Sequence, residues 1–402
     1  MTGLPRHRDV SSRLAALAAA CLLWGGAAAP AQAQQSVTDV LTFLMTNRSI
    51  PTDDFVRDER AAADTAGVLA RFLTLELATV PVPTSAGGFT YRLDPTLGTV
   101  VRSSDSFGPF FAERSLSSGR NRATLGLAYR SSSFRDIDGR SLRDGTLIST
   151  ASVLRGAAVP FDVETVALRI RTDTVTVTGN YGVSDRADIG IAVPFVRVRL
   201  DGQRADTYRG RTVVQAAGSA SASGVGDVVL RTKYNVFRDG ASGVAIAGEA
   251  LLPVGREEDL LGGGRTTITP RLIASYEGGR IGLHGDVGYA FRESSNALGY
   301  ALALTVVPAR TLTLVGEILG RRIEGLGRLA NTTQPHPRLV GIDTIRLTSV
   351  PRTTDRVLFA AGFKWNVADT WLATANVRKS LTSSGLEAGW VPTVTLEYSL
   401  GR

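Results

Sequence analysis

From about residue 122 to the end of the chain, apolar residues recur at every second position. Side chains alternate across a β-strand, so each segment has one apolar face and one polar or small face. In the segment after Arg280, Ile281, Leu283 and Val287 share the apolar face, while His284 and Asp286 fall on the other. The repeated alternation predicts an antiparallel all-β fold.

Twelve such segments of roughly ten to fourteen residues are separated by clusters of Gly, Asp, Asn and Ser. They begin near Arg122, Val163, Asp188, Gly224, Gly243, Arg265, Arg280, Asn296, Arg310, Asp355, Thr370 and Ala388. A soluble sandwich with apolar faces inward and a membrane barrel with apolar faces outward both fit this alternation.

The lengths of the connections favour the barrel. Those after the even-numbered segments are short, as at Gly182 to Arg186 and Arg238 to Ser242. Several of those after the odd-numbered segments are long, at Asp136 to Asp162, Asp201 to Ser223 and Glu324 to Thr354. Short turns that alternate with long loops are typical of membrane barrels, with the turns in the periplasm. We therefore expect a transmembrane up-and-down β-barrel of about twelve strands over residues 121–402.

Residues 1–33 have the pattern of a secretory signal. Arg6, Arg8 and Arg13 precede the apolar run Leu14 to Trp24, and Ala31-Gln32-Ala33 is an A-x-A cleavage site. We expect export and a mature chain from Gln34. The only cysteine is Cys21, so the mature chain would have neither disulfides nor thiolate ligands. A lipoprotein site at Cys21 is the less favoured alternative.

Residues 34–120 lack the regular alternation. Within 58–77, Val68, Leu69, Phe72 and Leu75 have helical spacing, yet leucines also alternate, so helix and strand both remain open. The stretch from Ser85 to Pro95 could be a further hairpin arm, which would raise the strand count to fourteen. A plug in the lumen, a periplasmic extension and extra barrel strands are all compatible with this segment.

The polar faces of the expected strands carry ionisable residues that would line the lumen. These are Asp227, Arg231, Lys233, Glu249, Arg271, His284, Asp286, Glu317, Arg321, Lys364, Arg378 and Glu397. With His284 neutral, bases and acids nearly balance, which favours salt-bridged pairs that brace a narrow lumen over an ion-selective ring of one sign. Contact with a passing solute is the alternative role.

Three stretches resemble a known family: Tyr181 to Phe195, Gly224 to Tyr234 and Gly248 to Arg256, with a weaker match at Leu283 to Tyr289. They look like the putative outer-membrane transporters named after the meta-pathway of phenol degradation. The resemblance implies an outer-membrane barrel that moves small, often aromatic or apolar compounds. Such barrels usually end on an aromatic residue read by the assembly machinery, whereas this chain ends on Arg402.

We therefore expect a passive or facilitated channel for small molecules in the outer membrane of a Gram-negative bacterium. Its partners would be outer-membrane lipid, the barrel-assembly machinery and a small solute. The N-terminal segment or the longest loops would gate it. A closed structural or adhesive barrel is the alternative.

Enzymatic and nucleic-acid functions are less favoured. A barrel lipid hydrolase would need a Ser and His pair, but only His284 and His336 follow the signal, and no serine lies in a nucleophile motif. Removing the signal, with three arginines and Asp9, takes +2 from the formal charge of +8, and the remaining +6 is too diffuse to indicate nucleic acid. We expect no catalytic residues, cofactor or bound metal.

Overall fold

The computed structural model describes residues 35–46, 55–78, 88–94, 99–292 and 295–400. The expected signal at residues 1–33 lies outside these ranges, as does Arg402. Within the described residues, no helix is both long and apolar enough to cross a membrane.

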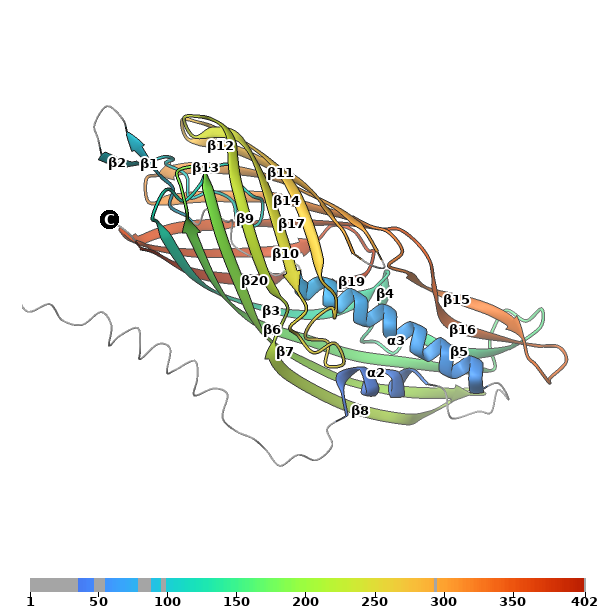
Figure 1. Cartoon of the computed structure of the whole chain (residues 1–402). Coiled ribbons are helices and arrows are strands. Elements are labelled where there is room, and N and C mark those ends of the chain that lie inside the picture. The colour runs from blue at the N-terminus through green and yellow to red at the C-terminus, as the bar shows by residue number, and fades with distance from the viewer. Residues whose placement is uncertain (1–34, 47–54, 79–87, 95–98, 293–294, 401–402) are drawn as a thin grey trace, which may run out of the picture. The chain divides into compact units, whose positions relative to one another are not determined.

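Twelve long antiparallel strands close into a transmembrane barrel in the described part of the chain (Figure 1). In order around the barrel they are β3 (Ala123–Ile137), β6 (Asp162–Gly182), β7 (Ala187–Tyr208), β9 (Val228–Asp239), β10 (Ser242–Leu252), β11 (Thr267–Gly278), β12 (Ile281–Ala290), β13 (Ala297–Ala309), β14 (Leu312–Ile323), β17 (Thr354–Ala368), β18 (Trp371–Ser380) and β20 (Val391–Leu400). Strand β20 pairs with β3 and closes the ring. The predicted fold class and all twelve segments are confirmed.

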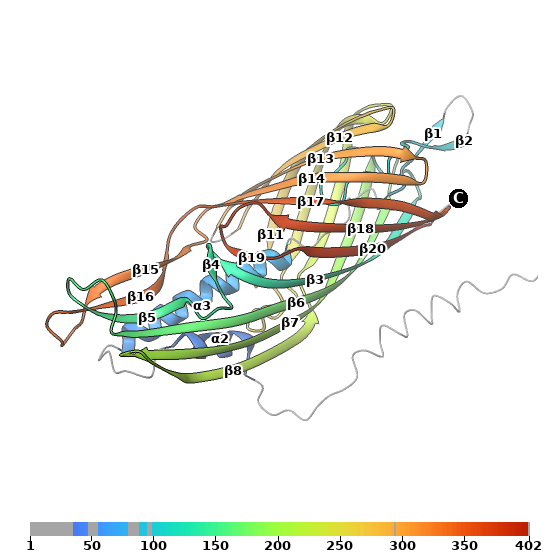
Figure 2. The same cartoon turned by 180° about the vertical axis from the view of Figure 1, so that it is seen from behind.

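The short connections lie at the end of the barrel that also holds the C-terminal strand end, which we call the turn end (Figure 1). At the opposite loop end, β6 and β7 continue far beyond the barrel as a sheet. Its other strands are β5 (Leu147–Leu154), β8 (Arg211–Val225), β15 (Arg328–Pro335) and β16 (Ile342–Val350) (Figure 2). Two short strands, β4 (Arg140–Ser141) and β19 (Leu386–Ala388), pair with β3 at this end.

These strands correct the prediction of plain loops at 136–162, 201–223 and 324–354. Strand β8 is rich in Ala, Ser and Gly, so its alternation is weak in the sequence, although it pairs with β7 from Arg211 to Val225. The hairpin β15–β16 is mostly polar at its tip and pairs with β5. Backbone pairing with neighbouring strands therefore determines that these segments are strands, although their side chains show no clear alternation.

A reversal of side-chain polarity marks where the membrane-facing surface ends. On β6, the outward side chains change from Val175 to Asp173, and on the paired β7 from Phe195 to Arg197. The same change occurs on β3 between Tyr129 and Ser131, in register with β6. An apolar belt that stops along one line across three strands is the limit of the hydrocarbon layer.

Beyond this line, the inner faces of the strands become apolar. Ile170, Val198 and Leu200 are buried there, each at most 4% exposed, and they belong to the largest apolar core of the molecule. Helices α2 (Val37–Met45) and α3 (Phe55–Ala78) cover this inner face (Figures 1 and 2). The loop-end extension is thus a sheet covered by helices, like a layer of a water-soluble domain.

Helix α3 resolves the ambiguity over residues 58–77 in favour of a helix. Ser36 caps α2 with a capping box to Asp39, which fixes where that helix begins. On α3, Leu69 and Phe72 are buried against the extension, with 1% and 0% of their surface exposed. Burial of one helical face against the extension therefore favours a helix over a strand in this segment.

Within the stretch Ser85 to Pro95, the described residues 88–94 add no strand to the barrel. Strand β1 (Tyr91–Asp94) pairs only with β2 (Thr99–Arg102), in a separate two-stranded sheet near the turn end (Figure 1). The ring therefore has twelve strands rather than fourteen.

Candidate functional site

Residues 104–118, which we call the lumenal segment, run across the inside of the barrel. Inward-facing side chains of the barrel strands, which we call the wall, bind the backbone of this segment. The amides of Phe110 and Phe111 donate to Glu317, that of Phe111 over 3.1 Å. The amide of Glu113 donates to Asp286 over 2.9 Å, and that of Ser118 to Asp188 over 2.9 Å. The wall carboxylates thus satisfy backbone donors that would otherwise be buried without partners.

Cations and an amide of the wall bind the carbonyl oxygens of the same segment. Lys233 donates to the oxygens of Arg114 and Leu116, and Lys364 to that of Phe107 over 3.2 Å. Asn235 donates to the oxygen of Ser115 over 2.7 Å. The polar side chains of the wall therefore form hydrogen bonds with the backbone of residues 104–118 as well as with one another.

The C-terminal turn of α3 brings a carboxylate to the loop-end side of the lumen. Glu76 lies 2.6 Å from Arg356 and 3.1 Å from Arg378, and all three side chains are at most 5% exposed. Arg130 donates to the backbone oxygen of Glu76. Sequence reasoning missed Glu76, Arg130 and Arg356. A lone glutamate in the apolar run that follows Phe72 was the available signal.

Four of the twelve predicted residues pair with one another on neighbouring strands. Arg231 lies 2.9 Å from Glu249, and Arg271 lies 2.6 Å from Asp286. Arg231 also pairs with Glu113, 3.0 Å away in the lumenal segment. These ion pairs join neighbouring strands, and one of their arginines also binds an acidic residue from the 34–120 segment.

Most of the remaining predicted residues contact the N-terminal segment instead. Lys233, Glu317 and Lys364 hold residues 104–118, as described above. Glu397 accepts from the amide of Gly88 over 2.9 Å, and Arg378 binds Glu76.

Asp227 has a different role from the others. It lies between β8 and β9 and accepts hydrogen bonds from the amides of Gly255 and Gly263, over 3.1 and 2.7 Å. A Cβ on Gly262 would meet its carboxylate at 2.1 Å, so only glycine fits this close approach. Asp227 therefore anchors the loop between β10 and β11.

His284 lies inside the barrel, with 2% of its surface exposed. Its Nδ1 is 3.1 Å from Oγ of Ser275, which sequence reasoning did not single out. Oγ of Ser275 accepts from the backbone amide of Ser115, so the lumenal segment covers the pair. The pair is part of the packing between wall and segment, and no lipid-facing surface reaches it.

Two cavities lie beside the last turn of α3. The first, which we call the charged chamber, is about 120 Å³ and lies between Glu76 of α3 and Phe111 of the lumenal segment. Its charged lining residues are Arg231, Arg271, Arg321, Arg356, Arg378, Glu76, Glu249 and Asp286. Leu75, Leu319 and Leu358 add apolar surface. The chamber has room for several water molecules, each of which needs about 10–15 Å³ of such space.

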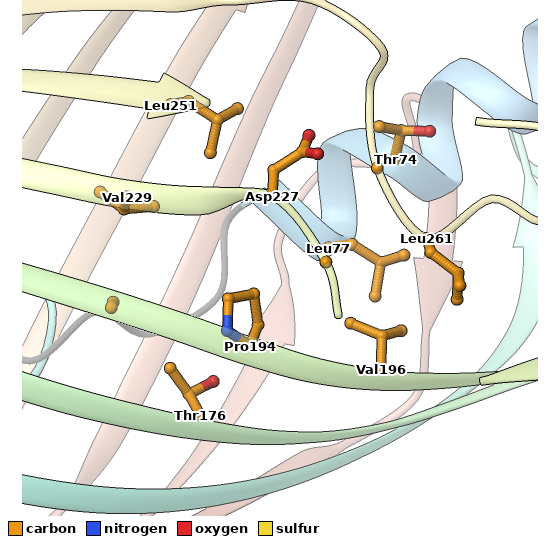
Figure 3. A pocket seen from close by; sticks show the side chains of 12 residues that line it. Thr74, Leu77, Thr176, Pro194, Val196, Asp227, Val229, Leu251 and Leu261 are labelled. Carbon is orange, nitrogen blue, oxygen red and sulfur yellow. The ribbon is translucent and has the colours of Figure 1, made fainter. Parts of the chain in front are cut away.

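The second cavity, which we call the apolar pocket, lies on the other side of the same helical turn (Figure 3). Leu77 of α3, Val196 of β7 and Leu261 of the β10–β11 loop line it together with Ala192 and other wall residues. Asp227 is the one charged residue among its lining residues, and it is occupied by the loop amides. This lining suits an apolar group and offers few polar partners.

Several solved structures resemble the barrel at low sequence identity. An outer membrane channel from Pseudomonas putida F1 shares 12% identity at a TM-score of 0.46, covering 71% of this chain and 98% of its own. The translocator domain of the autotransporter NalP from Neisseria meningitidis shares 10% at 0.32, covering 70% and 88%. The CymD monoaromatic hydrocarbon channel shares 8% at 0.28, covering 71% and 90%. A search of curated proteins found no match to the chain.

The sequence profile of one family matches residues 143–322, from the loop-end extension to the end of β14. This range contains the strand-and-turn motifs at 181–195, 224–234 and 248–256 on which the resemblance was based. Over residues 143–322, the chain is therefore similar to the family described as the putative MetA-pathway of phenol degradation.

Proposed function

We propose that this protein is an outer-membrane channel that admits small apolar or aromatic molecules by passive or facilitated diffusion. The observation that carries the proposal is the charged chamber of about 120 Å³ inside the barrel, which is separated only by the turn Thr74 to Leu77 from the apolar pocket of about 20 Å³. Contact with the apolar side chains of the chamber, such as Phe111 and Leu319, lowers the free energy of an apolar group that leaves water. The family description, which refers to phenol degradation, supports an aromatic solute.

Residues 34–120 act as the plug of this channel. Helix α3 covers the loop end, and residues 104–118 cross the lumen below it. Residues 104–118 contact the wall mostly through hydrogen bonds and ion pairs that water can replace one by one, whereas helices α2 and α3 pack in the apolar core of the extension. A solute would pass when the end of α3 or the lumenal segment shifts, which makes the plug the gate.

The barrel lies in the outer membrane of a Gram-negative bacterium, with the turn end toward the periplasm and the extension outside. Residues 1–33 direct export and are removed. The barrel-assembly machinery inserts the chain among outer-membrane lipids, and the protein catalyses no reaction. The apolar belt that ends at Val175 and Phe195 supports this placement.

Uptake of a labelled monocyclic aromatic compound by intact cells tests the proposal. Cells that express the protein should accumulate the label several-fold faster than cells that lack it. Leu319→Trp adds side-chain volume to the charged chamber and should reduce uptake, because Leu319 lines the chamber. The matched control is Leu302→Trp on the outward face, and a heat-modifiable band on SDS gels verifies that both variants are folded barrels. Equal uptake with and without the protein would contradict the proposal.

A second candidate is a closed structural or adhesive barrel, whose extension does the binding. The filled lumen favours it, because wall side chains bind residues 104–118 at many points. Conductance in a planar bilayer separates the two candidates. Repeated current steps support the channel, whereas a correctly inserted barrel that never conducts supports the closed barrel.

A further inference from the structure

The charged chamber contains more cations than anions. Five arginines and three carboxylates line it. Glu113, which pairs with Arg231, raises the acidic groups to four, but Arg130 and Arg292 also lie near the chamber, so cations still outnumber anions. A cation inside a barrel is costly when no anion compensates it.

Among the arginines that line the chamber, Arg321 on β14 is the one for which the described residues provide no ion pair. Its Nη1 is buried and has no hydrogen-bond partner among the described residues. The carboxylates nearby are engaged by other arginines: Glu76 by Arg356 and Arg378, and Glu249 by Arg231. The carboxylates therefore leave Arg321 available to a ligand.

The register of β14 and β17 places a second positive charge directly opposite Arg321. Arg321 pairs with Arg356 across β14 and β17, so two guanidinium groups start from adjacent positions of the inner wall. Like charges at opposed positions of a sheet repel. Glu76 compensates Arg356 at 2.6 Å, while Arg321 has no equivalent. An anion bound beside Arg321 would compensate its charge as Glu76 compensates that of Arg356.

The surroundings of Arg321 indicate an organic anion. Leu319 precedes it by two residues on the inner face, opposite Leu358, and Phe111 and Leu75 line the same chamber. A guanidinium group binds a carboxylate through two parallel hydrogen bonds. The apolar side chains would pack against the body of the solute. The chamber of about 120 Å³ has room for a body the size of one ring.

We propose that Arg321 is the anion subsite of the charged chamber and that it binds the carboxylate of a small aromatic acid. This inference rests on the proposed channel function and specifies the solute: an aromatic carboxylate, held while the apolar side chains contact its ring.

Arg321 and Arg322 are adjacent in the chain but face opposite sides of the barrel wall, so they provide a matched pair of variants. Arg321 faces the chamber, whereas Arg322 faces outward and is 61% exposed. Arg321→Gln and Arg322→Gln remove the same charge from adjacent positions of one strand. Arg321→Lys keeps the charge but loses the bidentate geometry. A heat-modifiable band on SDS gels verifies that each variant is a folded barrel.

Calorimetric titration of the purified full-length chain with benzoate and with benzyl alcohol tests the inference. Benzoate affinity should fall at least tenfold in Arg321→Gln, fall less in Arg321→Lys and remain unchanged in Arg322→Gln. Benzyl alcohol, which has the ring but no charge, should bind all four proteins equally. Equal losses of benzoate affinity in Arg321→Gln and Arg322→Gln would overturn the subsite.

Two further outcomes separate this inference from the channel function. If chloride displaces benzoate at equal concentration, the site is one for inorganic anions and the aromatic acid is excluded. If benzyl alcohol binds and enters cells while benzoate does not bind, the subsite fails and the channel stands. If neither compound binds or enters cells, both proposals fail.

Discussion

Glu76 and Arg356 lie 2.6 Å apart, although one belongs to helix α3 and the other to strand β17 of the barrel wall. With Arg378, which lies 3.1 Å from the same carboxylate, they join the helix to two neighbouring strands. All three side chains are at most 5% exposed. This contact holds the end of α3 between the two cavities, so we expect it to contribute to stability and, under the proposed gating, to limit the opening of the lumen.

Replacing Glu76 with Gln should therefore destabilise the barrel and loosen the plug. The change leaves two buried arginines without a carboxylate, which costs about 3 kcal/mol in the free energy of unfolding. Urea unfolding and planar-bilayer conductance measure the two effects, and conductance should rise. Glu59→Gln, on an exposed position of the same helix, is the control and should change neither. Indistinguishable behaviour of the two variants would refute the role of Glu76.

Leu302→Arg tests the membrane-facing belt. Leu302 lies in the middle of β13 and is 62% exposed on the outer surface. An arginine near the centre of the bilayer costs about 2–4 kcal/mol, whereas the same change in water would be nearly neutral. Val213→Arg on β8, a position 58% exposed beyond the belt, serves for comparison. Unfolding from lipid vesicles should show a loss only for Leu302→Arg; equal losses would argue against the position of the belt.

Lowering the pH should stabilise the far end of the extension. Burial raises the pKa of Asp162 to about 7, and a hydrogen bond and the charge of Asp206 act in the same direction. Asp162 lies outside the belt, eleven residues before Asp173 on the same strand. Because the folded state binds its proton more tightly than the unfolded state, stability falls as pH rises from about 4 to about 7.

Hydrogen exchange of the amides of β5 and β6 between pH 5 and pH 8, corrected for intrinsic rates, measures this dependence. Protection should decrease toward pH 8 in the unmodified protein. Asp162→Asn, which cannot ionise, should flatten the profile. A profile that Asp162→Asn leaves unaltered would assign the dependence to other groups.

The alternation of side chains predicted the barrel because burial in lipid imposes a strict period of two. Leu302, Phe363 and Val394 all face outward, so a single rule fixes each strand and its orientation. Inward residues such as Lys233 and Glu317 were identified by the same rule. Their side-chain orientation therefore follows from local sequence alone.

The partners of these residues did not follow from the alternation. Glu317 binds amides of Phe110 and Phe111, more than 200 residues away in the chain, and such backbone groups carry no side-chain signature. Helix α3 was ambiguous because its leucines fit two periods until the extension buried Phe72. The extension itself was hidden, since Ile170 and Leu200 reverse the inward pattern only beyond the membrane boundary.

A reversible cross-link between plug and wall tests the central claim most directly. The amide of Ser115 donates to Oγ of Ser275 over 2.9 Å, so the two residues are in contact, and cysteines placed at these positions are joined by a short, reducible thiol cross-linker. Cys21, in the expected signal, is the only cysteine of the sequence. Uptake of a labelled aromatic compound is measured in intact cells with Ser115→Cys and Ser275→Cys combined, and with Ser115→Cys alone. We predict that the cross-linker blocks uptake only in the double variant and that a reductant restores it. Uptake that continues at the same rate through the cross-linked protein would contradict a channel gated by its plug.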